Sequence, residues 1–431
     1  MQFITISLFA IIIIISFYQS FIKNREAYSI NKFLWVYILI FWAIVPLVQY
    51  RIDIFPWNIK VSEFNAIKAN MLILLWIVFY ILSYNTFKRK ELNIDVTVLS
   101  PQVSLKPSSI LLLLSIQFLI LLFFYLISGG FVFLRGDFDA QTISGTQSTY
   151  LIINQLLRAS TTFCTIIFAY YYKSTPSRKR LIILLLSLFL LIFTNFPLAI
   201  PRYMAGAFYI AIVFVLMPDF KHKSLPTIGL AILIFIIYPA LSVFRVKDQS
   251  VNDIQVSLAA ASFLTGDFDN YATLNMVIDY VNKHSITYGS QLLGVLFFFV
   301  PRSIWLSKPI GSGAFVAESN NWSFTNISCS YVAEGYLNFG FIGVIIFAII
   351  LGYTVSKLDA FFYHSKKLNF IKIFYPVSLG MIFFILRGDL MSSFAFTTGF
   401  IIAAVIIATV IRLRIIIKKD NIMCMPNKTR N

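Results

Sequence analysis

The sequence is short of charged residues, and this shortage sets the class of protein. Only 12% of the 431 residues are charged, whereas 59% are hydrophobic. A soluble fold of this size does not have enough interior to bury so much apolar surface. Cysteine is also scarce. The three cysteines lie in an apolar run, a polar stretch and the C-terminal tail, so no disulfide framework is expected.

Histidine is equally scarce, and nucleotide-binding motifs are missing. The three histidines stand at positions 222, 284 and 364, a spacing that fits neither a zinc site nor a Ser-His-Asp triad. No phosphate-binding loop and no dinucleotide fingerprint occurs in the chain. The sequence therefore predicts no metal centre and no cofactor. His284 is a minor candidate for a catalytic base.

Long apolar runs predict an all-α polytopic membrane protein. These runs extend over about 17 to 22 residues, the length that an α-helix needs to cross a hydrocarbon core of ~30 Å. The first run lacks a basic segment before it and a cleavage site after it, so we expect a retained span rather than a signal peptide. About eleven transmembrane helices are expected, at residues 3–22, 33–50, 66–84, 110–128, 150–172, 181–196, 203–217, 227–244, 335–356, 370–386 and 390–411.

The distribution of charge predicts the orientation of these helices. Lys and Arg are retained on the cytoplasmic side of short loops. If the N-terminus lies outside, roughly two thirds of the basic residues but only a third of the acidic residues fall inside. The inner face then accounts for the whole formal net charge of +17. We therefore expect a cytoplasmic C-terminus with a basic tail at 412–431, and contact with anionic lipids rather than nucleic acid.

The longest outside segment, residues 245–334, is the expected active-site loop of a single membrane domain. It is far longer than an ordinary connection, which indicates function, and short amphipathic helices are expected within it. The apolar piece Gly289–Val300 is too short to span, so we expect it to lie at the interface or to re-enter the membrane. The stretch Phe299–Gly340 then gathers charged residues among tryptophans and glycines, namely Arg302, Lys308, Glu318 and Glu334.

Gly-Asp-Phe-Asp occurs twice on the expected outer face, at 136–139 and 266–269. An Asp-x-Asp pair can hold a divalent metal on a diphosphate. In the second copy, however, Asp267 and Asp269 stand where a helix is expected to begin, and acids favour a helix N-terminus. In the first copy a contact with Arg135 explains the acids as simply. Both interpretations stay open.

Arginines occur at positions where a membrane protein rarely places them without a reason. Arg387 and Asp389 occupy a short turn between two spans, where an interfacial ion pair and a cation at the mouth of a cavity are both plausible. Arg158 lies within a span and must face a wet cavity or a polar partner. Arg202, Arg245 and Arg302 each fit an interfacial residue, but together they favour a binding site.

Four motifs follow one another between residues 195 and 340. They are Asn195-x-Pro197 with Pro201-Arg202, Gly266-Asp267-Phe268-Asp269, Phe299-Val-Pro-Arg-Ser-Ile-Trp-Leu-Ser-Lys-Pro309, and Ala333-Glu334-Gly-Tyr336-x-Asn338-Phe-Gly340. In this order they resemble the Wzy-type O-antigen polymerases, also called oligosaccharide repeat-unit polymerases. Arg302 and Gly313 also fit the Arg-x10-Gly spacing described for that family, although no second copy of the spacing occurs.

The resemblance implies a glycosyltransferase of the bacterial inner membrane that works on the periplasmic face. It would transfer a growing glycan from undecaprenyl pyrophosphate to the terminal sugar of a new lipid-linked repeat unit, in O-antigen or capsule synthesis. The activated donor carries the energy, so neither ATP nor a metal is expected. The expected partners are the lipid-linked oligosaccharide, membrane lipids, and a chain-length regulator and flippase of the same pathway.

This reaction assigns hypothetical roles to the residues singled out above. A diphosphate leaving group favours arginine ligands, and an acceptor hydroxyl needs a carboxylate within hydrogen-bond reach. The aromatic side chains either stack on sugars or simply lie at the membrane interface. The candidates are Arg158, Arg202, Arg245, Arg302 and Arg387 for the pyrophosphate, Asp267, Asp269, Glu318 and Glu334 for the base or acceptor positioning, and Trp305, Trp322 and Tyr336 for the sugars.

Two other functions fit a polytopic membrane protein of this kind. An O-antigen ligase would transfer the finished polymer to a lipid core, but the catalytic-loop histidine of ligases has no convincing match here, since His284 is the one histidine expected outside. A flippase of lipid-linked repeat units would show internal repeats and short loops on both faces, and neither is visible in the sequence.

Overall fold

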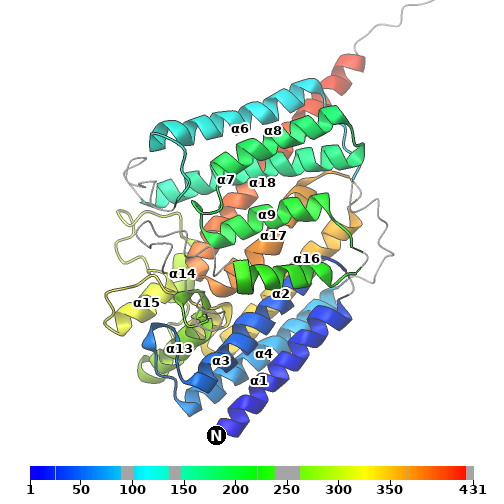
Figure 1. Ribbon diagram of the computed structural model, residues 1–431. Helices are drawn as coiled ribbons and strands as arrows, with labels where there is room; N and C mark the ends of the chain where they lie inside the picture. The colour runs from blue at the N-terminus through cyan, green and yellow to red at the C-terminus, as the bar shows by residue number, and fades with distance from the viewer. Residues whose placement is uncertain are drawn as a thin grey trace, which may run out of the picture.

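The computed structural model describes residues 1–24, 26–88, 101–134, 147–220, 222–237, 263–365 and 367–423, and all regular elements within these ranges are helical (Figure 1). Arg245, Arg135 and the first Gly-Asp-Phe-Asp copy lie outside the described residues. The N-terminal helices are α1 (Gln2–Phe17) with η1 (Tyr18–Lys23), α2 (Ile30–Tyr37), η2 (Ile38–Ile44), α3 (Val45–Ile52), η3 (Pro56–Asn58), α4 (Glu63–Phe87) and α6 (Pro107–Ser128).

The second half continues the helical pattern and includes several short helices. The long helices are α7 (Gln147–Ser174), α8 (Arg178–Thr194), α9 (Arg202–Leu216), α16 (Tyr331–His364), α17 (Phe370–Arg387) and α18 (Leu390–Met423). The shorter elements are α10 (Leu225–Ile232) with η5 (Leu233–Ile237), η7 (Gly266–Phe268), α13 (Asn270–His284), α14 (Ser290–Leu296) and α15 (Ser312–Ser319).

Many helices begin at a polar residue that caps the first turn. The side chains of Ser29, Ser62, Ser177, Ser330 and Asn369 each accept a hydrogen bond from the backbone N–H three residues further on. These caps satisfy backbone donors that a helix cannot satisfy internally. Each of these helices therefore begins at the polar residue that precedes its apolar run.

The described residues of each expected span lie largely on a helix, and seven helices within the described residues are long and apolar enough to cross a membrane. The seven correspond to the expected spans at 3–22, 33–50, 66–84, 110–128, 335–356, 370–386 and 390–411. The other four fall on α7, α8, α9 and α10–η5, which do not meet that criterion over the described residues. The fold class is thus all-helical with several membrane spans.

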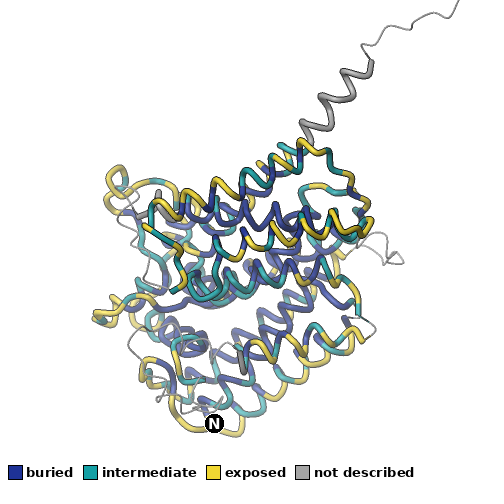
Figure 2. Tube along the Cα trace, turned by 45° about the horizontal axis from the view of Figure 1, so that its top comes forward, coloured by how far each residue is buried: buried dark blue, intermediate teal, exposed yellow. Residues whose placement is uncertain are grey.

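The helices pack as one bundle with a central layer. Helix α17 packs on α9 and α18, α16 packs on α4, and α7 packs on α8 and α18. Helices α6, α7 and α8 lie on one side of α9 and α17, and α1 and α4 lie on the other (Figure 1). In the most apolar 18-residue window of α2–α3 and of α17, 78% and 72% of the residues are buried, against 28% in the corresponding windows of α6 and α18. Figure 2 shows the same gradient from a buried interior to exposed outer faces.

The short helices gather at one end of this bundle. Helices α13, α14 and α15 lie at the end that holds the N-terminus, whereas α18 extends beyond the opposite end (Figure 1). Helix α14, in the apolar piece that was expected to be too short to span, has only 7 residues and packs on α18 and α16. The residues expected outside the membrane are therefore collected at one end of the molecule.

Helix α16 contains a break that explains one of the motifs. Gly340 has a positive φ of 62°, so the helix is interrupted after Asn338. The interruption frees the carbonyl groups of Leu337 and Asn338, which accept hydrogen bonds from the N–H groups of Thr287 (2.9 Å) and Gly289 (3.2 Å). The Asn-Phe-Gly sequence thus ties the outer segment of α16 to the start of α14.

Candidate active site

A cavity of about 680 Å³ opens where α9, α17 and α10–η5 meet the turn before α13. Its walls are apolar along the helices and charged at the end of the bundle that carries the short helices. The lining residues include Tyr37, Phe41, Trp57, Arg202, Tyr203, Gly206, Ile210, Leu230, Leu233, Ile234, Asp267, Asn326, Ser328, Gly380, Phe383, Phe384, Arg387, Asp389 and Phe396.

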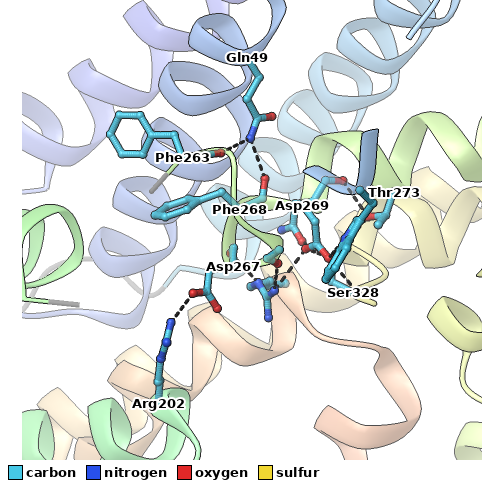
Figure 3. A network of polar contacts seen from close by, with 12 residues as sticks. Gln49, Arg202, Phe263, Asp267, Phe268, Asp269, Thr273 and Ser328 are labelled. Carbon is cyan, nitrogen blue, oxygen red and sulfur yellow. Dashed lines mark hydrogen bonds and ion pairs between the residues drawn. The ribbon is translucent and has the colours of Figure 1, made fainter. Parts of the chain in front are cut away.

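Arg202 and Asp267 form an ion pair on the cavity wall. Pro201 precedes Arg202 and ends the connection from α8, so the arginine is the first residue of α9. Its guanidinium donates to the carboxylate of Asp267 in η7, and Figure 3 shows the two side chains pointing toward each other. The side chains are 20% and 32% exposed, so solvent and ligands can reach this pair.

Arg387, the last residue of α17, forms the second ion pair of the cavity. It donates to the carboxylate of Asp269 at 3.2 Å and to the backbone carbonyl oxygens of Asp267 (2.9 Å) and Gly266 (2.5 Å). One guanidinium therefore holds both ends of the Gly-Asp-Phe-Asp turn. From α3, Gln49 fixes the same turn by donating to the carbonyl oxygen of Phe268 at 3.1 Å (Figure 3).

Asp269 is a buried junction between three parts of the chain. Besides Arg387, its carboxylate accepts hydrogen bonds from the indole N–H of Trp57 (3.0 Å) and from the hydroxyl (2.6 Å) and backbone N–H (3.2 Å) of Ser328. The expectation that a helix begins here is confirmed, since α13 starts at Asn270. The carboxylate of Asp269 does not cap that helix but joins the surrounding loops. Within the described part of the chain, no group of three metal-ligating side chains occurs.

Two further acids lie beside these ion pairs. Asp389 accepts hydrogen bonds from the backbone N–H groups of Gly313 (3.1 Å), Met391 (2.9 Å) and Ser392 (3.2 Å). Desolvation raises the pKa of Asp389 above its ordinary value, and these N–H groups oppose the rise. Glu334, fully buried, accepts from the hydroxyl of Ser312 at 2.7 Å and the N–H of Leu390 at 2.9 Å.

These two acids join the starts of α15, α16 and α18. The Gly311-Ser312-Gly313 sequence permits this, because a Cβ at Gly311 would collide with the Asp389 carboxylate and one at Gly313 with the Ile327 carbonyl. Of the two interpretations of Arg387 and Asp389, the contacts favour a cation at the cavity over an ion pair within the turn. Arg387 pairs with Asp269, and Asp389 binds backbone N–H groups.

Comparison with known protein families identifies the chain at this point. A family model described as O-antigen polysaccharide polymerase Wzy matches residues 1–420. The chain belongs to the Wzy family of O-antigen polysaccharide polymerases. It is therefore a multi-pass membrane protein of polysaccharide biosynthesis, a glycosyltransferase-type enzyme whose family acts on lipid-linked oligosaccharide. No curated protein and no solved structure matches it significantly.

The structure of this Wzy-family chain places Arg302 away from the residues that line the cavity. Arg302 is exposed and donates to the backbone carbonyl oxygens of Lys308 (2.6 Å) and Pro309 (3.1 Å). Lys308 in turn donates to the carbonyl oxygens of Phe298 (2.6 Å) and Val300 (2.9 Å), and burial followed by the charge of Arg302 lowers the pKa of Lys308. The two cations close the Phe-Val-Pro-Arg to Lys-Pro block into a compact loop.

Arg158 also lies apart from the cavity, inside the α6–α7–α8 group. Its guanidinium donates to the side chain of Asn154 at 2.8 Å and to the backbone carbonyl oxygen of Thr194, and it lies 4.4 Å from the ring centre of Phe124. The side chain is nearly buried, with 5% exposure. Of the two interpretations left open, these contacts favour interior structural pairing.

The remaining candidates are dispersed around the end of the bundle that carries the short helices α13, α14 and α15. Glu318 and His284 are exposed, and the imidazole of His284 packs on Tyr280. Trp305 and Trp322 are partly buried away from the cavity lining, and Tyr336 is buried with the ammonium of Lys68 5.2 Å from its ring centre. Of the residues proposed as site residues from the sequence, the cavity lining therefore includes Arg202, Asp267 and Arg387. Asp269 contacts this group through its ion pair with Arg387.

Sequence reasoning missed Trp57 and Ser328, which both donate hydrogen bonds to the carboxylate of Asp269. Trp57 adopts a positive φ of 64°, and its ring lies against Gly266 so closely that a Cβ there would collide with it. A tryptophan in the short Phe-Pro-Trp-Asn connection on the expected outer side was a usable signal. Ser328 has no such signal, because a serine in a polar loop is common.

Proposed function

We propose that this chain polymerises lipid-linked oligosaccharide repeat units on the periplasmic face of the bacterial inner membrane. The donor is a glycan on undecaprenyl pyrophosphate, and the acceptor is the terminal sugar of a new lipid-linked repeat unit. The observation that carries this proposal is the convergence of two arginines, each at the end of an apolar helix, on one cavity. Arginine is the preferred ligand of phosphate oxygens because its planar fork donates two parallel hydrogen bonds.

The reaction exchanges one bond of the anomeric carbon for another and moves one proton. The acceptor hydroxyl attacks the anomeric carbon of the donor sugar, the bond from that carbon to the diphosphate oxygen breaks, and the diphosphate leaves with the electron pair. Arg202 and Arg387 stabilise the charge that develops on the leaving diphosphate. The acceptor proton goes to a carboxylate, so the products are a glycan longer by one unit and free undecaprenyl pyrophosphate.

Asp267 is the carboxylate that we assign to the acceptor proton. Of the four acids predicted from the sequence, it is the one that lines the cavity. A diphosphate that binds Arg202 competes with the carboxylate of Asp267 for this guanidinium, and the same carboxylate is partly exposed to an acceptor hydroxyl in the cavity. Asp269 and Glu334 are positioning residues in this scheme, because their carboxylates already bind protein N–H and O–H groups.

The assignment of the site to the periplasmic side rests on the distribution of Lys and Arg among the loops, not on the cavity. The predicted periplasmic segments include the turn before α13 and the outer ends of α9 and α17, where the two arginines lie. Gly266, Asp267 and residues 326–328 of the predicted periplasmic loop then line one wall of the site, and α9 and α17 provide the two arginines. We also propose that the transfer needs no metal, and that the chain-length regulator and flippase of the same pathway are its partners.

The test replaces Arg202 with Ala in a strain that lacks the native gene. We expect the variant protein to accumulate normally and the surface glycan to carry single repeat units. Arg51→Ala is the control, because Arg51 is an exposed arginine at the end of α3. Normal long-chain glycan in the Arg202→Ala strain would refute the assignment. Loss of all glycan from the lipid core would favour a ligase, and lipid-linked units that fail to reach the outer face would favour a flippase.

A further inference from the structure

The cavity changes from charged to apolar along its depth. Helices α9 and α17 lie side by side, and each places an arginine at its outer end. Below Arg202, the residues of α9 that face the cavity are Tyr203, Gly206 and Ile210. The distance from Arg202 to Ile210 along the helix axis is about 12 Å. The cavity therefore continues well beneath the level of the two ion pairs.

The third wall of this lower part is the short helix α10 with η5. Leu230, Leu233 and Ile234 lie on one face of it and line the cavity. On its other faces, Ile228 and Ile232 are 45% and 47% exposed, as expected for side chains that meet lipid. In Figure 1 this helix lies between α9 and α2, in front of α17. We call the space between α9, α10–η5 and α17, below Arg202, the apolar arm.

Two glycines near the apolar arm have different surroundings. A Cβ at Gly380 of α17 would collide with the backbone of Ala207, so this glycine allows α9 and α17 to touch. A Cβ at Gly206 of α9 would meet nothing within 4 Å among the described residues, and Gly206 lines the cavity. The absence of a side chain at Gly206 therefore leaves open space on the cavity side of α9.

We propose that the apolar arm binds the first isoprene units of the polyprenyl chain whose diphosphate lies between Arg202 and Arg387. This inference rests on the proposed function and adds a subsite to it. Two arginines at the head of the arm complement the charge of a diphosphate better than that of a zwitterionic phospholipid. The stacked rings of Tyr203 and Phe384, 3.6 Å between centres, form an apolar and aromatic wall directly below. An unsaturated, branched chain fits this wall.

The experiment fills the arm without disturbing the arginines. Gly206→Leu places an isobutyl group in the open space, and Gly229→Leu places the same group on the exposed face of α10, where a Cβ also meets nothing within 4 Å in the described part of the chain. Both purified variants are assayed with a repeat-unit donor on a long polyprenyl diphosphate and with the same donor on a short alkyl diphosphate. We expect Gly206→Leu to raise KM for the long-chain donor by at least about tenfold, because buried apolar contact is lost.

The control and the short-chain donor decide between the possible causes. We expect Gly229→Leu to behave as wild type, and Gly206→Leu to raise KM for the short-chain donor far less than for the long-chain donor. An equal loss with both donors would mean that the substitution at Gly206 disturbs the head of the site, and unchanged activity with both would mean that the arm does not hold the chain. Either result overturns the subsite but leaves the polymerase function in place.

Binding measured without turnover separates this inference from the proposed function. Native mass spectrometry of the wild-type protein with polyprenyl diphosphate should show one bound molecule, weakened in Gly206→Leu and unchanged in Gly229→Leu. If wild type fails to polymerise either donor while this binding pattern holds, the proposed function fails and the subsite stands. If phospholipid is retained in place of polyprenyl diphosphate, the subsite fails.

Discussion

Two ends of the bundle both hold buried acids, but they use them differently. At the cavity end, the buried carboxylate of Asp269 and the partly exposed carboxylate of Asp267 pair with arginines that line the cavity. At the opposite end, Asp359 of α16 accepts hydrogen bonds from the backbone N–H groups of Ile30 (3.0 Å) and Asn31 (3.3 Å), which begin α2. The comparison teaches that burial of an acid does not by itself mark a functional site.

The surroundings of Asp359 are closed by protein groups. The hydroxyls of Tyr375 (2.6 Å) and Tyr84 (3.3 Å) also donate to it, and its residue exposure is only 6%. The carboxylate complements the positive end of α2 and takes the donors that the first turn cannot satisfy. Asp359 is thus a joint between α2, α4, α16 and α17, whereas the pair Arg202–Asp267 remains open to exchange with a ligand.

The largest effect on stability is expected when this joint is broken. Asp359→Ala removes the carboxylate that accepts from two backbone N–H groups and two hydroxyls in the interior, which costs about 3–5 kcal/mol. Thermal unfolding of the detergent-solubilised protein should show a large drop in midpoint. Asp219→Ala is the control, since Asp219 pairs with Lys223 on the exposed surface and should change stability by less than about 1 kcal/mol. Similar midpoints for the two variants would contradict the assigned roles.

A smaller but sharper difference is expected between the two cavity arginines. Lysine retains the positive charge but cannot donate to the three acceptors of Arg387 in the same planar geometry. Arg387→Lys should therefore loosen the turn around buried Asp269 and lower the unfolding midpoint. Arg202→Lys should leave stability within about 1 kcal/mol, because its pair is partly exposed. Both variants should shorten the surface glycan. Equal unfolding midpoints for the two variants would show that the pairs are equivalent.

Arg302 is expected to have a moderate effect that Lys308 shares. Both side chains close one loop by donating to backbone carbonyl oxygens, so Arg302→Ala and Lys308→Ala should each reduce polymerisation by about three- to tenfold. Rates of glycan extension in membranes measure this. A complete loss in Arg302→Ala, together with normal rates in Lys308→Ala, would instead place Arg302 in direct contact with the substrate.

The smallest expected effect is a pH dependence that originates at Asp389. Because the folded-state pKa of this acid is raised, its contribution to stability is present below the unfolded pKa, ~3.9, and is lost as pH rises through the folded pKa. The unfolding midpoint should therefore decline gradually from acidic toward neutral pH. Asp389→Asn does not ionise, so its midpoint should decline less over the same range. Parallel profiles would assign the decline to other groups.

The sequence predicted the seven long apolar helices because their hydrophobic length largely determines them. The pairing of charges was harder. An ion pair between Arg387 and Asp389, neighbours in the turn, was one of two interpretations, but Arg387 pairs with Asp269, which is 118 positions away. Such a contact depends on how α17 packs against the turn before α13, and local sequence does not contain that information. Trp57 was missed for the same reason, since its ring reaches Asp269 only after η3 and η7 meet.

The break in α16 at Gly340 has a consequence for biosynthesis. The helix beyond the break, residues 341–364, is about 36 Å long and is sufficient to cross the bilayer alone. In the proposed orientation, the segment that carries Glu334 lies on the periplasmic side of this span and need not cross the hydrocarbon core. Glu334 would then reach its site with the translocated loop, and the hydrogen bonds from Thr287 and Gly289 to the freed carbonyl groups would hold that segment in place.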